Sequence, residues 1–127
     1  MNAPLEISAL TKVFDTPAGP FVAVKDVNAT IDQGEFVCIL GHSGCGKSTV
    51  LSILAGLELA TFGGVVIDGT QVVGPGPERA LVFQSPCLLP WLTARENVML
   101  AAGQRPLHNG VRCWLVVLRS CEQHLSA

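Results

Sequence analysis

The chain has 127 residues, of which 49% are hydrophobic and 14% charged, a size and composition typical of one small folded domain or part of a larger one, not of a disordered chain. Its net charge of −2 leaves no basic surplus to neutralise a phosphate backbone, so we expect no nucleic-acid partner. Mean hydropathy is high at +0.45, yet no apolar run reaches the roughly 20 residues of a membrane-spanning helix. The N-terminus lacks the basic and apolar regions of a signal peptide, and five cysteines without a Cys-x-x-Cys pair favour reduced thiols in the cytoplasm.

The first quarter of the chain predicts antiparallel strands with one solvated face. Residues 5–10 and 27–31 alternate between apolar and polar or small side chains, and residues 21–24 begin a strand between them. Turn-forming residues are concentrated at 15–20, and Gln33-Gly34 marks the next turn. We therefore expect this stretch, which ends at residue 32, to form an antiparallel meander.

A different pattern follows the meander. Phe36–Leu40 is a continuous apolar run, which is typical of a strand buried on both faces in a parallel sheet. Apolar residues from Val50 to Leu57 recur at helical spacing. Residues 65–67, followed by a turn at Asp68-Gly69, and residues 80–83 predict two further strands, and the apolar run at 80–83 is again typical of a strand buried on both faces. Thr93, with a Glu three residues later, matches a capping box that opens a helix.

A glycine loop between the first apolar strand and the first helix has the spacing of a phosphate-binding motif. It reads Gly41-His42-Ser43-Gly44-Cys45-Gly46-Lys47-Ser48, followed by Thr49, and matches the Walker A pattern. Glycine permits positive φ, so that successive N–H groups can surround phosphate oxygens. We expect Lys47 to contact the β- and γ-phosphates and Ser48 to bind Mg²⁺, while His42 and Cys45 contribute backbone N–H groups rather than a base and a reactive thiol. The alternative, a glycine-rich turn that merely contains Lys-Ser, is disfavoured because a strand and a helix flank the loop.

Gly34–Thr49, the run Leu54-Ala55-Gly56-Leu57 and the run Val82-Phe83-Gln84 together resemble the ATP-binding subunits of ABC transporters. That family places an antiparallel subdomain ahead of the phosphate loop, as the meander predicts here. The resemblance implies an α/β fold of the P-loop NTPase type with an N-terminal antiparallel β-subdomain and, in this chain, an incomplete core.

Residues 74–79 and 88–98 are similar to the nitrate, sulfonate and taurine importers of this family, and Gly41-His42-Ser43 is most similar to nitrate importers. The resemblance implies a subunit that couples ATP binding and hydrolysis to the import of nitrate or a similar oxyanion. It implies ATP and Mg²⁺ as cofactors. It also implies transmembrane permease subunits and a second nucleotide-binding subunit as partners, on the cytoplasmic face of the cell membrane.

The resemblance assigns roles to individual residues. Gln84 would be the Q-loop glutamine that contacts Mg²⁺ and the attacking water, so Lys47 and Gln84 are the catalytic candidates. Phe14 would stack on adenine, with Phe21 as a second candidate, although both could instead be core residues. Leu88–Leu92 would line the groove that receives a coupling helix of the permease, unless these residues pack locally in the core.

Several motifs that the family places after the Q-loop do not occur in the sequence: the Leu-Ser-Gly-Gly-Gln signature, a Walker B aspartate followed by the catalytic glutamate, and the switch histidine. The composition also changes after residue 102, since residues 103–127 contain three arginines, two cysteines and two histidines but no lysine. We interpret residues 1–102 as the N-terminal part of a nucleotide-binding domain, truncated after the Q-loop region. We interpret residues 103–127 as an atypical tail produced by a frameshift.

Three alternatives remain open at this point. The chain could be a catalytically inactive remnant or nucleotide-binding interaction module, or a small metabolite kinase. The kinase would use the tail arginines Arg105, Arg112 and Arg119 as a lid. A zinc cluster could form from the tail residues His108, Cys113, Cys121 and His124, although their spacings match no standard zinc pattern.

Overall fold

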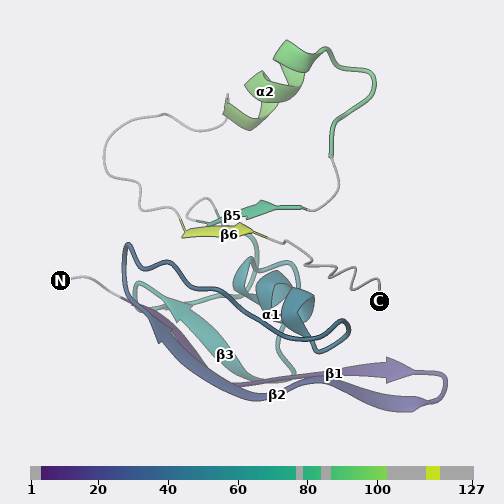
Figure 1. Cartoon of the computed structure of the whole chain (residues 1–127), viewed down its shortest axis with the longest axis vertical. Helices are drawn as coiled ribbons and strands as arrows, with labels where there is room; N and C mark the ends of the chain where they lie inside the picture. The colour runs from purple at the N-terminus through teal and green to yellow at the C-terminus, as the bar shows by residue number, and fades with distance from the viewer. Residues whose placement is uncertain (1–3, 77–78, 84–86, 103–113, 118–127) are drawn as a thin grey trace, which may run out of the picture.

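The structure is a computed structural model that describes residues 4–76, 79–83, 87–102 and 114–117. Its larger sheet contains four antiparallel strands in the order β2-β1-β3-β4 (Figure 1). Strands β1 (Leu5–Thr16) and β2 (Gly19–Ile31) form a long hairpin that turns at residues 17–18. The predicted meander and its turn are therefore confirmed, but β1 continues six residues beyond the predicted end at residue 10.

The other edge of this sheet is a short hairpin that follows the first helix. Strands β3 (Phe62–Ile67) and β4 (Thr70–Gln71) are antiparallel, and β3 pairs with β1. Asp68 and Gly69 connect them with φ values of 50° and 75°, the positive pair that a tight two-residue hairpin turn requires. The strand predicted at 65–67 and the turn after it are thus confirmed.

Helix α1 (Lys47–Leu54) packs on the face of this sheet and completes its core. Its buried residues Val50, Ile53 and Leu54 join Leu10 and Val24 in one cluster. Apolar spacing predicts a helix up to residue 57, but the helix ends at residue 54 because Gly56 adopts φ 79°.

The end of α1 has the hydrogen bonds of a Schellman motif, in which the chain reverses through a left-handed residue. The Gly56 N–H donates to the Ile53 carbonyl at 3.0 Å, and the Leu57 N–H donates to the Ser52 carbonyl at 2.9 Å. The Leu57 side chain is consequently exposed rather than continuing the buried face of the helix. Local backbone chemistry therefore overrides the apolar spacing at this end.

A second, parallel sheet lies on the other side of α1 (Figure 1). It contains β5 (Arg79–Val82) and β6 (Trp114–Val117), which pair in parallel from Arg79↔Trp114 to Val82↔Val117. Leu81 of β5 packs against the same core cluster as α1, so the helix is covered on two sides. Sequence analysis missed β6, although the short apolar run from Trp114 to Leu118 was a usable signal.

The capping box predicted at Thr93 is confirmed at the start of helix α2 (Ala94–Ala102). The Thr93 N–H donates to the Glu96 carboxylate at 2.7 Å, and the Glu96 N–H is 3.3 Å from the Thr93 hydroxyl. Figure 1 shows α2 set apart from both sheets, and Val98, Met99 and Leu100 are exposed on it. Neither helix in the described part of the chain is long and apolar enough to cross a membrane.

The prediction of a strand buried on both faces at Phe36–Leu40 is wrong. Residues 35–40 form no helix or strand, and the Phe36 and Leu40 side chains are 90% and 89% exposed. A doubly buried strand needs a hydrogen-bonded neighbour on each side and a covering layer on each face. In the part of the chain that the structure describes, β5 pairs with β6 rather than with this segment. The strand predicted at 80–83 does form, but Val82 and Phe83 are about half exposed, so its double burial is wrong as well.

Candidate nucleotide-binding site

The phosphate-loop motif lies directly before α1, at the N-terminal end of the helix. Gly46 is the N-cap residue, with φ 93° and ψ 7°, a left-handed conformation that L side chains rarely adopt. A Cβ at Gly46 would lie far inside van der Waals contact of the Ala23 carbonyl oxygen and 3.0 Å from Val24 Cγ2. Glycine at this position therefore allows the start of α1 to rest directly on the backbone of β2.

The ammonium group of Lys47 is held inside the loop. It donates to the carbonyl oxygens of Gly41 and His42 at 2.7 and 2.6 Å, and its Nζ lies 3.3 Å from Cys45 Sγ. These partners are uncharged loop atoms, and phosphate oxygens form stronger, charge-assisted hydrogen bonds with an ammonium group. The cation is thus already at the loop and can exchange neutral acceptors for anionic ones.

The start of α1 supplies further groups that favour an anion. The N–H groups of the first turn, which includes Ser48 and Thr49, have no acceptors within the helix, and the helix dipole adds partial positive charge. His42, Ser43, Gly44, Cys45 and Ser48 are exposed, so a ligand can reach the loop. Unpaired N–H donors, one lysine and an accessible hydroxyl on Ser48 form a donor set that fits a nucleoside triphosphate with its Mg²⁺.

Gly41 shows how closely the loop surrounds this lysine. A Cβ at Gly41 would lie 2.5 Å from Cys45 Sγ, so a larger residue would displace the Cys45 side chain, whereas the Lys47 side chain at 3.8 Å would be in ordinary van der Waals contact. Gly44 differs, since its φ of 78° requires the left-handed region but nothing lies within 4 Å of the position that a Cβ would occupy. The two glycines therefore serve different purposes, close approach at Gly41 and backbone direction at Gly44.

The two candidate aromatic residues are opposite each other on the β1–β2 hairpin. Phe14 pairs with Phe21 in the strand register, and Phe14 is half-buried while Phe21 is 54% exposed. In the same register Lys12 pairs with Val24, the residue beneath Gly46. Phe14 is two residues further along β1, about 7 Å at the usual rise per residue of a strand. The hairpin thus extends past the phosphate loop and carries both aromatic rings beyond it.

A lysine that sequence analysis did not single out connects this hairpin to the segment after α1. Lys12 Nζ forms an ion pair with Glu58 at 2.6 Å and donates to the Leu59 carbonyl at 2.8 Å. The same Nζ lies 4.9 Å from the centroid of the Phe14 ring. A lysine two residues before an aromatic on a strand was the available sequence signal, because such residues share a face.

The segment predicted to meet a permease presents two large apolar side chains. Leu88 and Trp91 are 68% and 74% exposed, so the alternative of local core packing does not hold for them, whereas Leu89 and Leu92 are less exposed. Asn97 of α2 fastens this segment, since its side chain accepts from the Leu89 N–H at 2.9 Å and donates to the Leu92 carbonyl at 3.2 Å. Sequence analysis missed this role of Asn97.

Several residues to which the sequence assigns a role lie outside the part of the chain that the structure describes. Among them is Gln84, the proposed second catalytic group and Mg²⁺ contact. The same is true of the kinase-lid and zinc-cluster residues, which are Arg105, Arg112, Arg119, His108, Cys113, Cys121 and His124. These assignments stay predictions, as does the division of the chain at residue 102.

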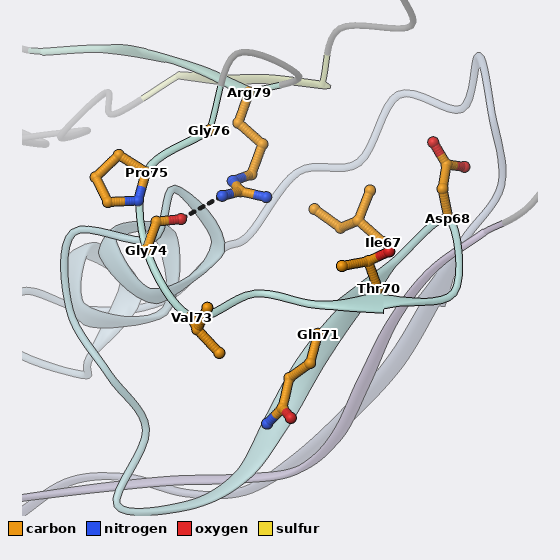
Figure 2. A pocket seen from close by; sticks show the side chains of 9 residues that line it. All are labelled: Ile67, Asp68, Thr70, Gln71, Val73, Gly74, Pro75, Gly76 and Arg79. Carbon is orange, nitrogen blue, oxygen red and sulfur yellow. Dashed lines mark hydrogen bonds between the residues drawn. The ribbon is translucent and has the colours of Figure 1, made fainter.

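A separate hollow of about 420 Å³ lies under the loop that precedes β5 (Figure 2). Its lining residues are Ile67, Asp68, Thr70, Gln71, Val73, Gly74, Pro75, Gly76 and Arg79. The Arg79 guanidinium, which is 9% exposed, donates to the Gly74 carbonyl. A Cβ at Gly56 would collide with Gly74, so this loop packs on the C-terminal end of α1. The loop that lines the hollow thus lies at the opposite end of α1 from the glycine loop, where the helix dipole is negative.

Comparison with known proteins gives consistent results. Residues 24–126 match the family model described as ABC transporter. The nitrate import ATP-binding protein NrtD of Synechococcus elongatus is 52% identical over 97 residues, which cover 76% of this chain and 35% of that protein. The bicarbonate transport ATP-binding protein CmpD of the same species is 46% identical over 97 residues, with the same coverage of both chains. The nitrate transport protein NasD of Klebsiella oxytoca is 46% identical over 104 residues, which cover 82% of this chain and 40% of that protein.

Solved structures agree with these sequence matches. A dimeric ATP-binding cassette bound to ADP and Pi superposes with a TM-score of 0.70 at 35% identity, covering 84% of this chain and 50% of that chain. A nucleotide-free cassette from an ABC transporter gives a TM-score of 0.57 at 26% identity, covering 66% of this chain and 34% of that chain. The chain thus spans about a third of the length of the NrtD and CmpD relatives and half of the solved cassette.

Proposed function

Because the chain belongs to the ABC transporter family, we propose that it is the ATP-binding part of an importer for nitrate or a similar oxyanion. The observation that carries ATP binding is the phosphate loop, in which Lys47 is held at the start of α1 by Gly41 and His42. The importer assignment is supported by the relatives whose names specify nitrate or bicarbonate transport. Nitrate and bicarbonate are both small oxyanions, so we propose a small oxyanion as the substrate class.

Different residues contact different parts of the bound ATP. Backbone N–H groups from Gly41 to Thr49 surround the phosphates, and Lys47 neutralises charge on the β- and γ-phosphates. Ser48 would hold Mg²⁺ through its hydroxyl, with Gln84 as a second contact. When bound, Mg²⁺ offsets the negative charge of the triphosphate. Phe14 stacks on the adenine ring, which requires no hydroxyl on the aromatic residue.

We assign nucleotide binding, rather than hydrolysis, to these 127 residues taken alone. Lys47 and Gln84 are the two family catalytic positions that the sequence contains, while a signature motif and a Walker B strand ending in Asp-Glu do not occur in it. Without a glutamate next to the attacking water, no general base is placed there. ATP hydrolysis coupled to import would then require residues beyond those of this chain.

We propose permease subunits and a second nucleotide-binding subunit as partners, on the inner face of the cell membrane. Support for the permease contact comes from Leu88 and Trp91, whose exposed apolar side chains suit a helix docked in a groove. Support for the second subunit comes from the solved cassette, which is dimeric.

The second candidate function is an interaction module that occupies the permease without turnover. The observation in its favour is the same exposed pair, Leu88 and Trp91, which Asn97 holds in place independently of the phosphate loop. Binding of the purified chain to membrane subunits, measured with and without Mg-ATP, separates the two. Permease binding that changes with Mg-ATP supports the importer subunit, whereas permease binding that is independent of nucleotide supports the module.

Titration calorimetry with Mg-ATP tests nucleotide binding. The Lys47→Ala variant is expected to bind about 10- to 100-fold more weakly, the range for losing a hydrogen bond to a charged group. Lys25→Ala removes an exposed lysine of β2 and serves as the matched control, with unchanged affinity expected. Equal affinity of wild type and Lys47→Ala would remove the loop from the binding site.

A further inference from the structure

Lys12 is mostly buried although it carries a charge. Its side chain is 13% exposed, and the ammonium contacts Glu58 Oε1 at 2.6 Å and the Leu59 carbonyl at 2.8 Å. Its third neighbour is the Phe14 ring, whose centroid lies 4.9 Å away, within the range of a cation–π interaction. One ammonium group therefore joins three partners.

These partners come from two segments that are far apart in the sequence. Phe14 is on β1, whereas Glu58 and Leu59 follow the C-terminal turn of α1. The α1 side is further attached by Thr61, whose N–H donates to the Thr11 carbonyl at 2.8 Å and whose hydroxyl accepts from the Val13 N–H at 3.0 Å. Lys12 thus sits where the helix that begins at the phosphate loop returns to the strand that carries the aromatic ring.

The ion pair alone does not explain this arrangement. The Glu58 side chain is 40% exposed, and an ion pair open to solvent contributes little to stability. A half-buried phenylalanine on a strand can occupy more than one rotamer, and a cation over one face favours the rotamer that keeps the contact. The effect of Lys12 is therefore to hold the ring in one orientation with one face covered.

We propose that Lys12 is a positioning residue for adenine recognition: it clamps one face of Phe14 and leaves the other face for the base. This inference rests on the proposed ATP binding at the phosphate loop. A ring held in place loses less conformational entropy when it stacks on a ligand, so the clamp strengthens binding of the base without touching the phosphates.

The test compares ATP with inorganic tripolyphosphate, which reaches the phosphate loop but has no base. Calorimetric titrations use the full 127-residue chain as wild type, Lys12→Met and Lys12→Arg. Lys12→Met is expected to weaken ATP binding about two- to fivefold, the range of a cation–π contact, and to leave tripolyphosphate unchanged. Lys12→Arg retains a cation that can stack on the ring and should restore most of the ATP affinity. Lys25→Met is the matched control and should change neither ligand.

A double-mutant cycle separates positioning from a general effect on the fold. In a Phe14→Leu background the Lys12→Met change should no longer affect ATP, because the ring it acts through is gone. Equal weakening of ATP and tripolyphosphate, or an unchanged Lys12→Met effect in the Phe14→Leu background, would overturn the positioning role. Circular dichroism verifies the fold of each variant. Lys12→Gln, which keeps a hydrogen-bonding head group without charge, provides the same measurement should Lys12→Met fail to fold.

ATP binding at the phosphate loop and the role of Lys12 are refuted by different results. If the wild-type chain binds neither ATP nor tripolyphosphate, the proposed function falls and the role of Lys12 falls with it. If the wild type binds both ligands and Lys12→Met binds ATP with wild-type affinity, only the role of Lys12 is overturned.

Discussion

Replacing Gly46 by alanine should destabilise the chain, because two separate effects act at this one position. Its φ of 93° requires the left-handed region, which costs a non-glycine residue about 1–2 kcal/mol. A Cβ would also press on the Ala23 carbonyl and on Val24 at 3.0 Å. The carbonyl belongs to the backbone of β2 and cannot move without the hairpin, so we add about 1–3 kcal/mol for overpacking.

Gly44 is the matched control for this experiment. It lies in the same loop, with φ 78°, but nothing lies within 4 Å of the position of an added Cβ. Gly44→Ala should therefore cost only the backbone strain of about 1–2 kcal/mol. The difference between the two variants isolates the contact between the loop and β2.

Urea unfolding followed by far-ultraviolet circular dichroism measures this difference. With a denaturant dependence of about 1–2 kcal/mol/M, the combined loss of about 2–5 kcal/mol should lower the urea midpoint of Gly46→Ala by more than about 1 M. Gly44→Ala should lower it by roughly half as much or less. Equal midpoints for the two variants would refute the reasoning, because the loop would then not rest on β2 as closely as the geometry indicates.

Three further predictions concern α2, the aromatic rings and the exposed segment. Hydrogen bonds from the Thr93 N–H and, to a lesser extent, from its hydroxyl lower the pKa of Glu96. The cap therefore stabilises α2 at pH values above the ordinary glutamate pKa and loses this effect as the pH falls through the lowered pKa. Helicity measured against pH should show that loss, and Glu96→Gln should abolish this pH dependence. Phe14→Ala should weaken ATP but not tripolyphosphate, and a selective loss in Phe21→Ala instead would move the stacking role to that ring. The chain should bind the dye ANS and self-associate through exposed apolar side chains such as Phe36, which is 90% exposed. A clean monomer with one sharp thermal transition would contradict this.

The sequence was sufficient to predict the elements whose turns and caps form between residues close together in the chain. The β1–β2 hairpin, the Asp68-Gly69 turn and the Thr93 capping box were all predicted, because their turns and caps use residues a few positions apart. The loop from Gly41 to Ser48 was likewise recognisable as a Walker A pattern, since that pattern is defined by residue type and spacing. The family it indicates was confirmed by comparison.

Other features depended on contacts that no local pattern contains. The same kind of apolar run became an exposed segment at Phe36–Leu40 and a paired strand at β5, because a strand needs a partner that the run itself does not supply. The helical spacing up to Leu57 was interrupted by the conformation of Gly56.

The sequence by itself indicated the family, the β1–β2 hairpin and the Asp68-Gly69 turn, because these depend on residue type and short spacing. The tertiary structure alone decided that Gly46 rests on β2 and that Lys12 reaches Glu58, 46 positions away, while it covers Phe14. Such contacts form only after β1, β2 and α1 have packed into one core, since packing sets the distance between residues that are remote in the chain.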